Sequence, residues 1–175
     1  MEVPPTLLSS TTYVNVQIRM ASCANTSRES EEKGHEVFCE KNMDGSLKAT
    51  LADFGFAART DDAETISGRC GTAGFIAPEI FRKKWTGYNK PAADILKIDV
   101  FSLGMVLLAM ITARNPFIGC DQEESFQLNA RGLPEGYLEG LPLANELKLL
   151  LDDALQTDPH LRCSISDVVS HPWLE

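Results

Sequence analysis

Asp53-Phe54-Gly55 opens, and Ala77-Pro78-Glu79 closes, the stretch that decides the fold of this 175-residue chain. Between these motifs, Gly71-Thr72-Ala73-Gly74-Phe75-Ile76 runs directly into Ala77. Either tripeptide alone recurs by chance in unrelated turns. The two together, in this order and with Gly-Thr-x-x-aromatic-x before Ala-Pro-Glu, indicate one segment with a single role rather than two unrelated loops.

The paired motifs resemble the activation segment of a eukaryotic protein kinase. Thr72 resembles the Gly-Thr threonine that faces the catalytic loop in the serine/threonine branch of that family, which gives it a substrate-side role. The resemblance implies that Asp53 binds the Mg²⁺ that accompanies ATP, because magnesium prefers hard oxygen ligands. Phe54 would pack beside it as an apolar plug, and Gly55 would let the backbone turn.

The family's catalytic loop, His-Arg-Asp-Leu-x-x-x-Asn, has no full counterpart in this sequence. Two alignments stay open. In the first, His35 and Asn42 take the His and Asn positions. Val37 then falls where the family has the Asp that handles the proton of the substrate hydroxyl.

In the second alignment, which we prefer, Glu31 takes the Asp position, Lys33 the position of the catalytic-loop lysine and Glu36 that of the metal-binding Asn. The reason for the preference is that Val37-Phe38-Cys39 then matches the strand that follows the loop in the family. The same acidic residues are also typical of a solvated loop. Under either alignment the catalytic Asp itself is absent.

Two strands are predicted between this loop and Asp53. Asp44-Gly45 is a strong hairpin turn signal, and it follows the apolar Val37-Phe38-Cys39. After the turn, apolar residues alternate with polar ones from Leu47 to Ala52, as in a half-buried strand. A further strand candidate, Thr12 to Met20, resembles the strand that leads into the kinase hinge, while the rest of residues 1–35 is typical of a leader or linker.

Asp99-Val100-Phe101-Ser102-Leu103-Gly104 resembles the opening of the central helix of the kinase large lobe. We therefore expect a helix that begins with Asp99 as a buried N-terminal acceptor and is apolar, and buried, on all sides. The apolar run from Val100 to Ala113 is too short to span a bilayer. Arg162 falls where the family has a partner for Glu79, which implies a bidentate, structural ion pair.

Helical spacing of apolar residues from Leu143 to Leu155 predicts another helix, and Ser164-x-x-Asp167 is typical of a capping box at the start of a last one. The resemblance implies that residues 119–142 cover the helix and loops that often dock partners. Hydroxyl groups in the activation segment are candidate phosphorylation sites, where new negative charge would pair with arginines. These are Thr60, Thr65 and Ser67.

The net charge is −9, from 16 Lys and Arg against 25 Asp and Glu, so we expect no nucleic-acid partner and no anionic membrane. The five cysteines contain no Cys-x-x-Cys, which argues against a zinc site or a disulfide framework. A reducing setting, cytoplasmic or nuclear, fits this pattern. The start of the chain has neither a basic region nor a long apolar core of the kind found in a secretory signal.

Together these observations predict a mainly α (α+β) fold: a kinase-like C-lobe over residues 36–175, with an activation segment at 53–79 and a small β-hairpin before it. The sequence contains no Gly-x-Gly-x-x-Gly and no Val-Ala-Ile-Lys, so we expect the N-lobe to be missing. The resemblance implies transfer of the ATP γ-phosphate to protein serine or threonine, with this chain inactive alone. The alternative is a pseudokinase-like binding module. Expected partners are protein substrates, other proteins, or a second copy bound through the exposed lobe face.

Overall fold

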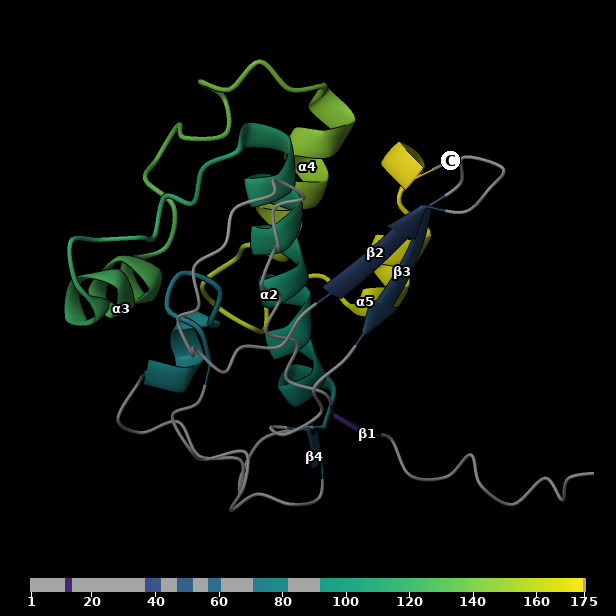
Figure 1. Cartoon of the computed structure of the whole chain (residues 1–175), viewed down its shortest axis with the longest axis horizontal. Coiled ribbons are helices and arrows are strands. Elements are labelled where there is room, and N and C mark those ends of the chain that lie inside the picture. Colours follow the sequence, from purple (N-terminus) through teal and green to yellow (C-terminus); the bar gives the residue numbers. More distant parts are fainter. Residues whose placement is uncertain are drawn as a thin grey trace, which may run out of the picture.

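The computed structural model describes residues 12–13, 37–41, 47–51, 57–60, 71–81 and 92–174 (Figure 1). Its helices are α2 (Ala92–Thr112), α3 (Gln122–Arg131), α4 (Asn145–Ala154) and α5 (Ile165–Val169). Its strands are β1 (Thr12–Tyr13), β2 (Val37–Lys41), β3 (Leu47–Leu51) and β4 (Ala58–Arg59). Two short 3-10 helices complete the list, η1 (Pro78–Phe81) and η3 (Pro172–Leu174).

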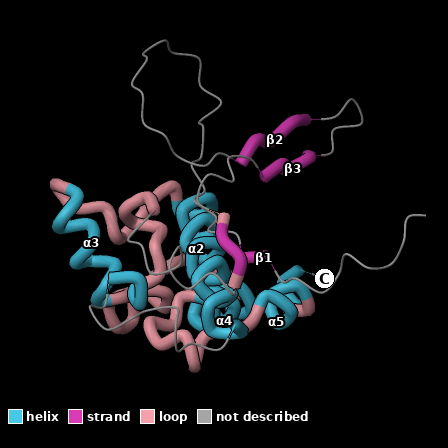
Figure 2. The backbone as a smooth tube through the Cα atoms, turned by 90° about the horizontal axis from the view of Figure 1, so that it is seen from below, coloured by secondary structure: helices cyan, strands magenta, loops and turns pink. Residues whose placement is uncertain are grey.

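Helix α2 forms the axis of the helical body. Figures 1 and 2 both show α3 on one side of it and α4 with α5 on the other. Helix α2 packs against α4 and α5, whereas α3 contacts η1, at the end of the stretch that closes with Glu79. The helices thus place residues that are far apart in sequence around one long apolar element.

The strands form two separate antiparallel pairs. β2 pairs with β3, with Val37 opposite Leu51 and Lys41 opposite Leu47, and Figure 2 shows this pair set apart from the helices. β1 pairs with β4, so Thr12 lies opposite Arg59. The turn signal at Asp44-Gly45 lies outside the described residues, as do residues 14–20 of the first predicted strand.

Helix α2 begins at Ala92, about two turns before Asp99, so the prediction that it begins at Asp99 is wrong. The physical reason is that the buried apolar face extends toward the N-terminus from Asp99, since Ile95 and Ile98 are each only 1% exposed. Ala92 and Ala93 favour the helix further, and Pro91 precedes it, a residue tolerated at helix starts. Asp99 is therefore a half-buried residue inside the helix rather than its N-terminal cap.

The earlier start also changes the length of α2. In the described part of the chain, residues 93–112 are long and apolar enough, by length and composition only, to cross a membrane. The prediction that this apolar stretch is too short to span a bilayer is therefore wrong, because it counted the stretch only from Val100. The core helix of a folded lobe meets the same criterion, and Phe101, Met105 and Leu108 have no exposed surface here. Burial on all sides is also wrong, since Met110 is 56% exposed and Ile111 40%.

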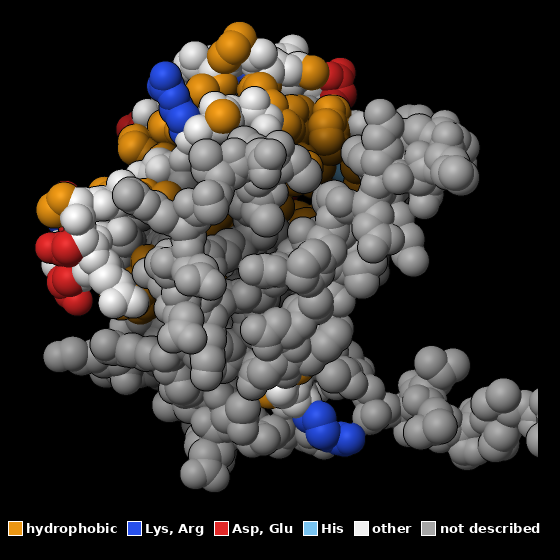
Figure 3. All heavy atoms as spheres, viewed as in Figure 1, with side chains coloured by type: hydrophobic (Ala, Val, Ile, Leu, Met, Phe, Trp, Pro, Cys, Tyr) orange, Lys and Arg blue, Asp and Glu red, His pale blue; other side chains and the backbone are white. Residues whose placement is uncertain are grey.

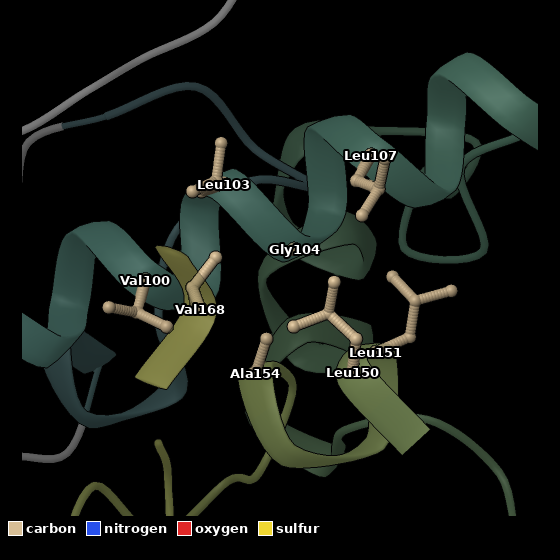
Figure 4. Close-up of a pocket in the computed structure, with 8 residues that line it drawn as sticks. All are labelled: Val100, Leu103, Gly104, Leu107, Leu150, Leu151, Ala154 and Val168. Atoms are coloured by element: carbon tan, nitrogen blue, oxygen red, sulfur yellow. The ribbon is translucent and has the colours of Figure 1, made fainter. Parts of the chain in front are cut away.

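Helices α2 and α4 approach each other closely at Gly104. A Cβ atom at this position would lie 3.0 Å from Leu155 Cδ2 and 3.1 Å from Ala154 Cβ, so a larger residue would push the helices apart. Beside this contact is an apolar hollow, and Figure 4 shows side chains of α2 and α4 facing each other across it. It is lined by Val100, Leu103, Gly104, Leu107, Leu150, Leu151, Ala154 and Val168.

The C-terminal helices match the sequence pattern. Leu147, Leu150 and Leu151 are buried on one face of α4. The predicted capping box of α5 is confirmed: the Ser164 hydroxyl accepts from the Asp167 N–H, and the Asp167 carboxylate accepts from the Ser164 N–H. The hydrogen bonds from the Ser164 side chain and backbone lower the pKa of Asp167.

Helix α3 lies within residues 119–142, where the resemblance implies a helix and partner-docking loops. It begins after Asp121, whose side chain accepts a hydrogen bond from the Glu124 N–H at 2.8 Å. Two acidic residues in its first turn, Glu123 and Glu124, suit the positive end of the helix dipole. In Figure 3 acidic side chains gather over this helix, whereas hydrophobic side chains are visible above it, toward α4.

Candidate functional site

The described residues of the predicted activation segment lie mainly in 71–81, which we call the anchored segment. A turn comes first, in which the Phe75 N–H donates to the Thr72 carbonyl at 3.1 Å. Gly74 has φ +89°, a conformation that favours glycine. The short helix η1 follows, and its Glu79 has no exposed surface.

Side chains from three elements hold the backbone of residues 74–76. Ser102 of α2 donates from its hydroxyl to the Phe75 carbonyl at 2.9 Å. Asn115, between α2 and α3, donates to the Gly74 carbonyl at 3.1 Å. Asn129 of α3 accepts from the Gly74 N–H at 2.7 Å and donates to the Ile76 carbonyl at 2.8 Å.

Sequence reasoning missed the roles of Asn115 and Asn129. A weak signal existed for Asn129, because it lies one helical turn after the half-buried Phe126, on the face that α3 buries. A polar residue on a buried helix face usually has a hydrogen-bond partner. The sequence could not identify this partner, which lies 53 to 55 residues earlier in the chain.

The ion pair expected between Glu79 and Arg162 is present at the other end of the anchored segment. Arg162 Nη1 lies 2.7 Å from Glu79 Oε1, and Nη2 lies 2.9 Å from Oε2, which is the bidentate geometry. Both side chains are almost completely buried. The pair joins η1 to the stretch between α4 and α5, 83 residues later.

The rest of the Arg162 guanidinium is also satisfied. Nη1 donates to the Lys97 carbonyl at 2.8 Å, and Nε donates to the Gln156 carbonyl at 2.9 Å. The Phe101 ring lies 5.0 Å from the guanidinium carbon, within range of a cation–π contact. Arg162 therefore connects η1, α2 and the end of α4 through one buried group.

A second contact ties the loop after α4 to the first turn of α2. Asp94 Oδ2 lies 3.2 Å from His160 Nδ1, an ion pair only when the imidazole is protonated. Among the described residues this buried oxygen has no hydrogen-bond partner, so we treat the contact as weak. Next to it, Lys97 Nζ donates to the Pro159 carbonyl at 3.0 Å.

The structure brings together only part of the predicted site. Thr72 lies half-buried in the first turn of the anchored segment, and Thr60 lies just after β4. Asp99 lies inside α2, as corrected above. The other predicted catalytic, metal-binding and phosphorylation residues lie outside the described residues: Glu31, Lys33, Glu36, Asp53, Phe54, Gly55, Thr65 and Ser67.

No group of three or more His, Cys, Asp or Glu side chains that could hold a metal ion occurs within the described ranges. The fit of Mg²⁺ at Asp53 therefore stays a prediction from the sequence. What the described residues provide is a rigidly held backbone and a buried ion pair. These groups position chain segments and do not themselves transfer protons or phosphate.

Comparison with known proteins gives a consistent result. The sequence model of the protein kinase domain matches residues 33–174. Serine/threonine-protein kinase RAD53 of Saccharomyces cerevisiae is 28% identical over 139 residues, which cover 76% of this chain and 17% of the relative. Sperm motility kinase 3A of Mus musculus is 34% identical over 142 residues, covering 81% and 25%. Aurora kinase of Dictyostelium discoideum is 32% identical over 131 residues, covering 75% and 30%.

Among solved structures, the chain is similar to the crystal structure of the Rad53 kinase domain and SCD2 in complex with AMPPNP. The TM-score is 0.51 at 24% sequence identity, and the match covers 74% of this chain and 43% of that chain. This likeness shows a protein-kinase-like fold. The chain spans a third or less of the length of the curated relatives named above, from 17% to 30%.

Proposed function

Because this chain belongs to the eukaryotic serine/threonine protein kinase family, we propose that it is a kinase large lobe that retains the substrate-side segment for binding protein. The family activity is transfer of the ATP γ-phosphate to serine or threonine. We propose that this chain does not catalyse that transfer alone, and that it acts as a non-catalytic binding module of the pseudokinase type.

The observation that carries this proposal is the way the anchored segment is held. Its backbone is fixed by Ser102, Asn115 and Asn129, and its end by the pair of Glu79 and Arg162. All of these contacts are made by residues 102–162, and none involves the stretch from Glu31 to Asn42. A segment held this way keeps its backbone conformation without phosphoryl transfer, and its half-buried residues 71–73 and 75 are the part that is open to a partner.

The sequence between Glu31 and Asn42 supports the loss of catalysis. Phosphoryl transfer relies on a residue that positions the substrate hydroxyl and on groups that hold the metal ions. Neither alignment of this stretch supplies the positioning Asp, whichever of Glu31 or Val37 takes its place. Asp53 would hold Mg²⁺ with ATP by family resemblance, and its carboxylate alone replaces neither missing group.

Nucleotide binding and transfer by the full 175-residue chain test this proposal. We expect no rise in the thermal unfolding midpoint with Mg-ATP below 1 mM. We also expect no transfer of ³²P from labelled ATP to a serine/threonine test peptide above the level of the Asp53→Asn variant. A midpoint shift and transfer that both disappear in Asp53→Asn would overturn the non-catalytic assignment and establish the chain as a kinase.

The partners of this lobe are proteins, as the family indicates. A cytoplasmic or nuclear setting and self-association stay predictions from the sequence. So does phosphorylation at Thr60, Thr65 or Ser67, because the arginine that the family supplies from its catalytic loop is absent from this sequence. Loop hydroxyls with no regulatory role are the simpler interpretation; Thr60 is half-buried, and Thr65 and Ser67 lie outside the described residues.

A further inference from the structure

Asn129 is a polar side chain with no exposed surface, on the face of α3 that also carries the half-buried Phe126. An amide side chain buried without partners would destabilise the fold by a few kcal/mol. Here the Oδ1 atom accepts from the Gly74 N–H and the Nδ2 atom donates to the Ile76 carbonyl. The burial is therefore specific to this one stretch of backbone.

We propose that Asn129 is a positioning residue for the anchored segment. Its amide spans residues 74 and 76 with one acceptor and one donor, as the backbone of a neighbouring β-strand would. The bonds are short, at 2.7 and 2.8 Å, and water cannot replace them because the side chain is enclosed. Asn129 thereby fixes the backbone that carries Phe75, the residue that closes the turn begun at Thr72.

Asn115 completes the arrangement from the opposite side of Gly74. It donates to the Gly74 carbonyl, so both polar backbone groups of Gly74 are bonded to asparagine side chains. A Cβ at Gly74 would lie 2.7 Å from Asn115 Nδ2, so a larger residue would require Asn115 to move and give up its hydrogen bond. Gly74 at φ +89° is therefore held in one conformation by α3 and by the connection that precedes it.

We call the hydrogen bonds of Asn129 and Asn115 to residues 74 and 76 the clamp. The evidence for the clamp consists of these hydrogen bonds only. Its consequence for partner binding rests on the proposed function, in which the half-buried residues 71–73 and 75 contact a protein. Amide hydrogen exchange separates the two, because it reports the Gly74 N–H directly and needs neither nucleotide nor partner.

The experiment compares two variants of Asn129 in the full chain with one control. Asn129→Leu keeps the approximate size and removes both hydrogen bonds, so we expect exchange at Gly74 to rise at least about tenfold relative to the amides of α4. Asn129→Asp keeps the acceptor for the Gly74 N–H and loses the donor to the Ile76 carbonyl, so we expect protection at Gly74 between that of Asn129→Leu and that of the unsubstituted chain. A general loss of stability would instead raise exchange at Gly74 and in α4 together.

Ser125→Ala is the matched control. Ser125 is also buried on α3, but its hydroxyl donates to the Asp121 carbonyl and accepts from the Gly119 N–H, away from the anchored segment. We expect Gly74 exchange to stay unchanged in this variant. A rise there equal to that in Asn129→Leu would overturn the proposal.

Two further outcomes decide the proposal. If Asn129→Leu leaves Gly74 as protected as before, the proposal is wrong. If Asn129→Leu does not fold, Asn129→Asp decides: protection at Gly74 supports the clamp, and exchange at the rate of global unfolding overturns it. Kinase activity in the chain would contradict the proposed function, yet the exchange result would still report on the clamp.

Discussion

Two ion pairs connect the region after α4 to the rest of the lobe, and they differ in burial and in hydrogen bonding. Arg162 binds both carboxylate oxygens of Glu79 and two backbone carbonyls, and neither side chain is exposed by more than 1%. Asp94 and His160 make one contact at 3.2 Å, with the histidine side chain 62% exposed. The two pairs lie at neighbouring turns of α2, but we expect them to contribute very different amounts to the free energy of unfolding.

The difference shows when a buried charge is tolerated. Desolvation of two ions costs several kcal/mol, and it is offset only where the geometry is good and the remaining donors are bonded. The Glu79 pair meets both conditions. The Asp94 pair has a partner that stays in water, so its attraction is weak and screened by salt.

The largest expected effect comes from breaking the buried pair. Arg162→Met removes every guanidinium hydrogen bond and leaves the Glu79 carboxylate buried without a counter-charge. We expect the free energy of unfolding to fall by about 3–5 kcal/mol, measured by urea unfolding of the full chain. The double variant Glu79→Leu with Arg162→Met should regain much of the loss, because it removes the stranded charge. A single variant that loses less than about 1 kcal/mol would show that the pair is not buried in solution.

Two glycines, Gly74 and Gly136, show the same contrast between a position enclosed by other atoms and one open to solvent. Gly74 and Gly136 both have positive φ, at +89° and +73°, but a Cβ would clash at Gly74 and meet nothing within 4 Å at Gly136. Both Ala variants bear the backbone strain, of about 1–3 kcal/mol. We therefore expect Gly74→Ala to destabilise the chain more than Gly136→Ala in thermal unfolding. Equal losses would mean that Asn115 moves away at no cost.

The smallest effect is expected at the exposed pair. His160→Gln keeps a polar side chain and removes only the contact to Asp94, so we expect a change of less than about 0.5 kcal/mol in the free energy of unfolding. The measurement is the same urea titration, at low and high salt. A loss above about 1 kcal/mol would place this pair in the class of Glu79 and Arg162.

Local patterns in the sequence determined much of this protein. Short-range rules predicted the capping box at Ser164 and Asp167 and the helical spacing of α4, because both depend on residues three or four positions apart. The motifs around Glu79 identified the family and the partner of Glu79. The same reliance on a motif placed the start of α2 at Asp99, although the apolar residues at 95 and 98 continue the helix back to Ala92.

Only the tertiary structure decided which side chains hold the anchored segment. The sequence gives no signal for Asn115 and only a weak one for Asn129, and their partner backbone lies more than 40 positions away. No local pattern encodes such a pairing, because it depends on how α3 packs beside η1 once α2 is in place. Because a buried polar group must have its hydrogen-bond partner within the protein, burial makes the contacts of these two asparagine side chains specific.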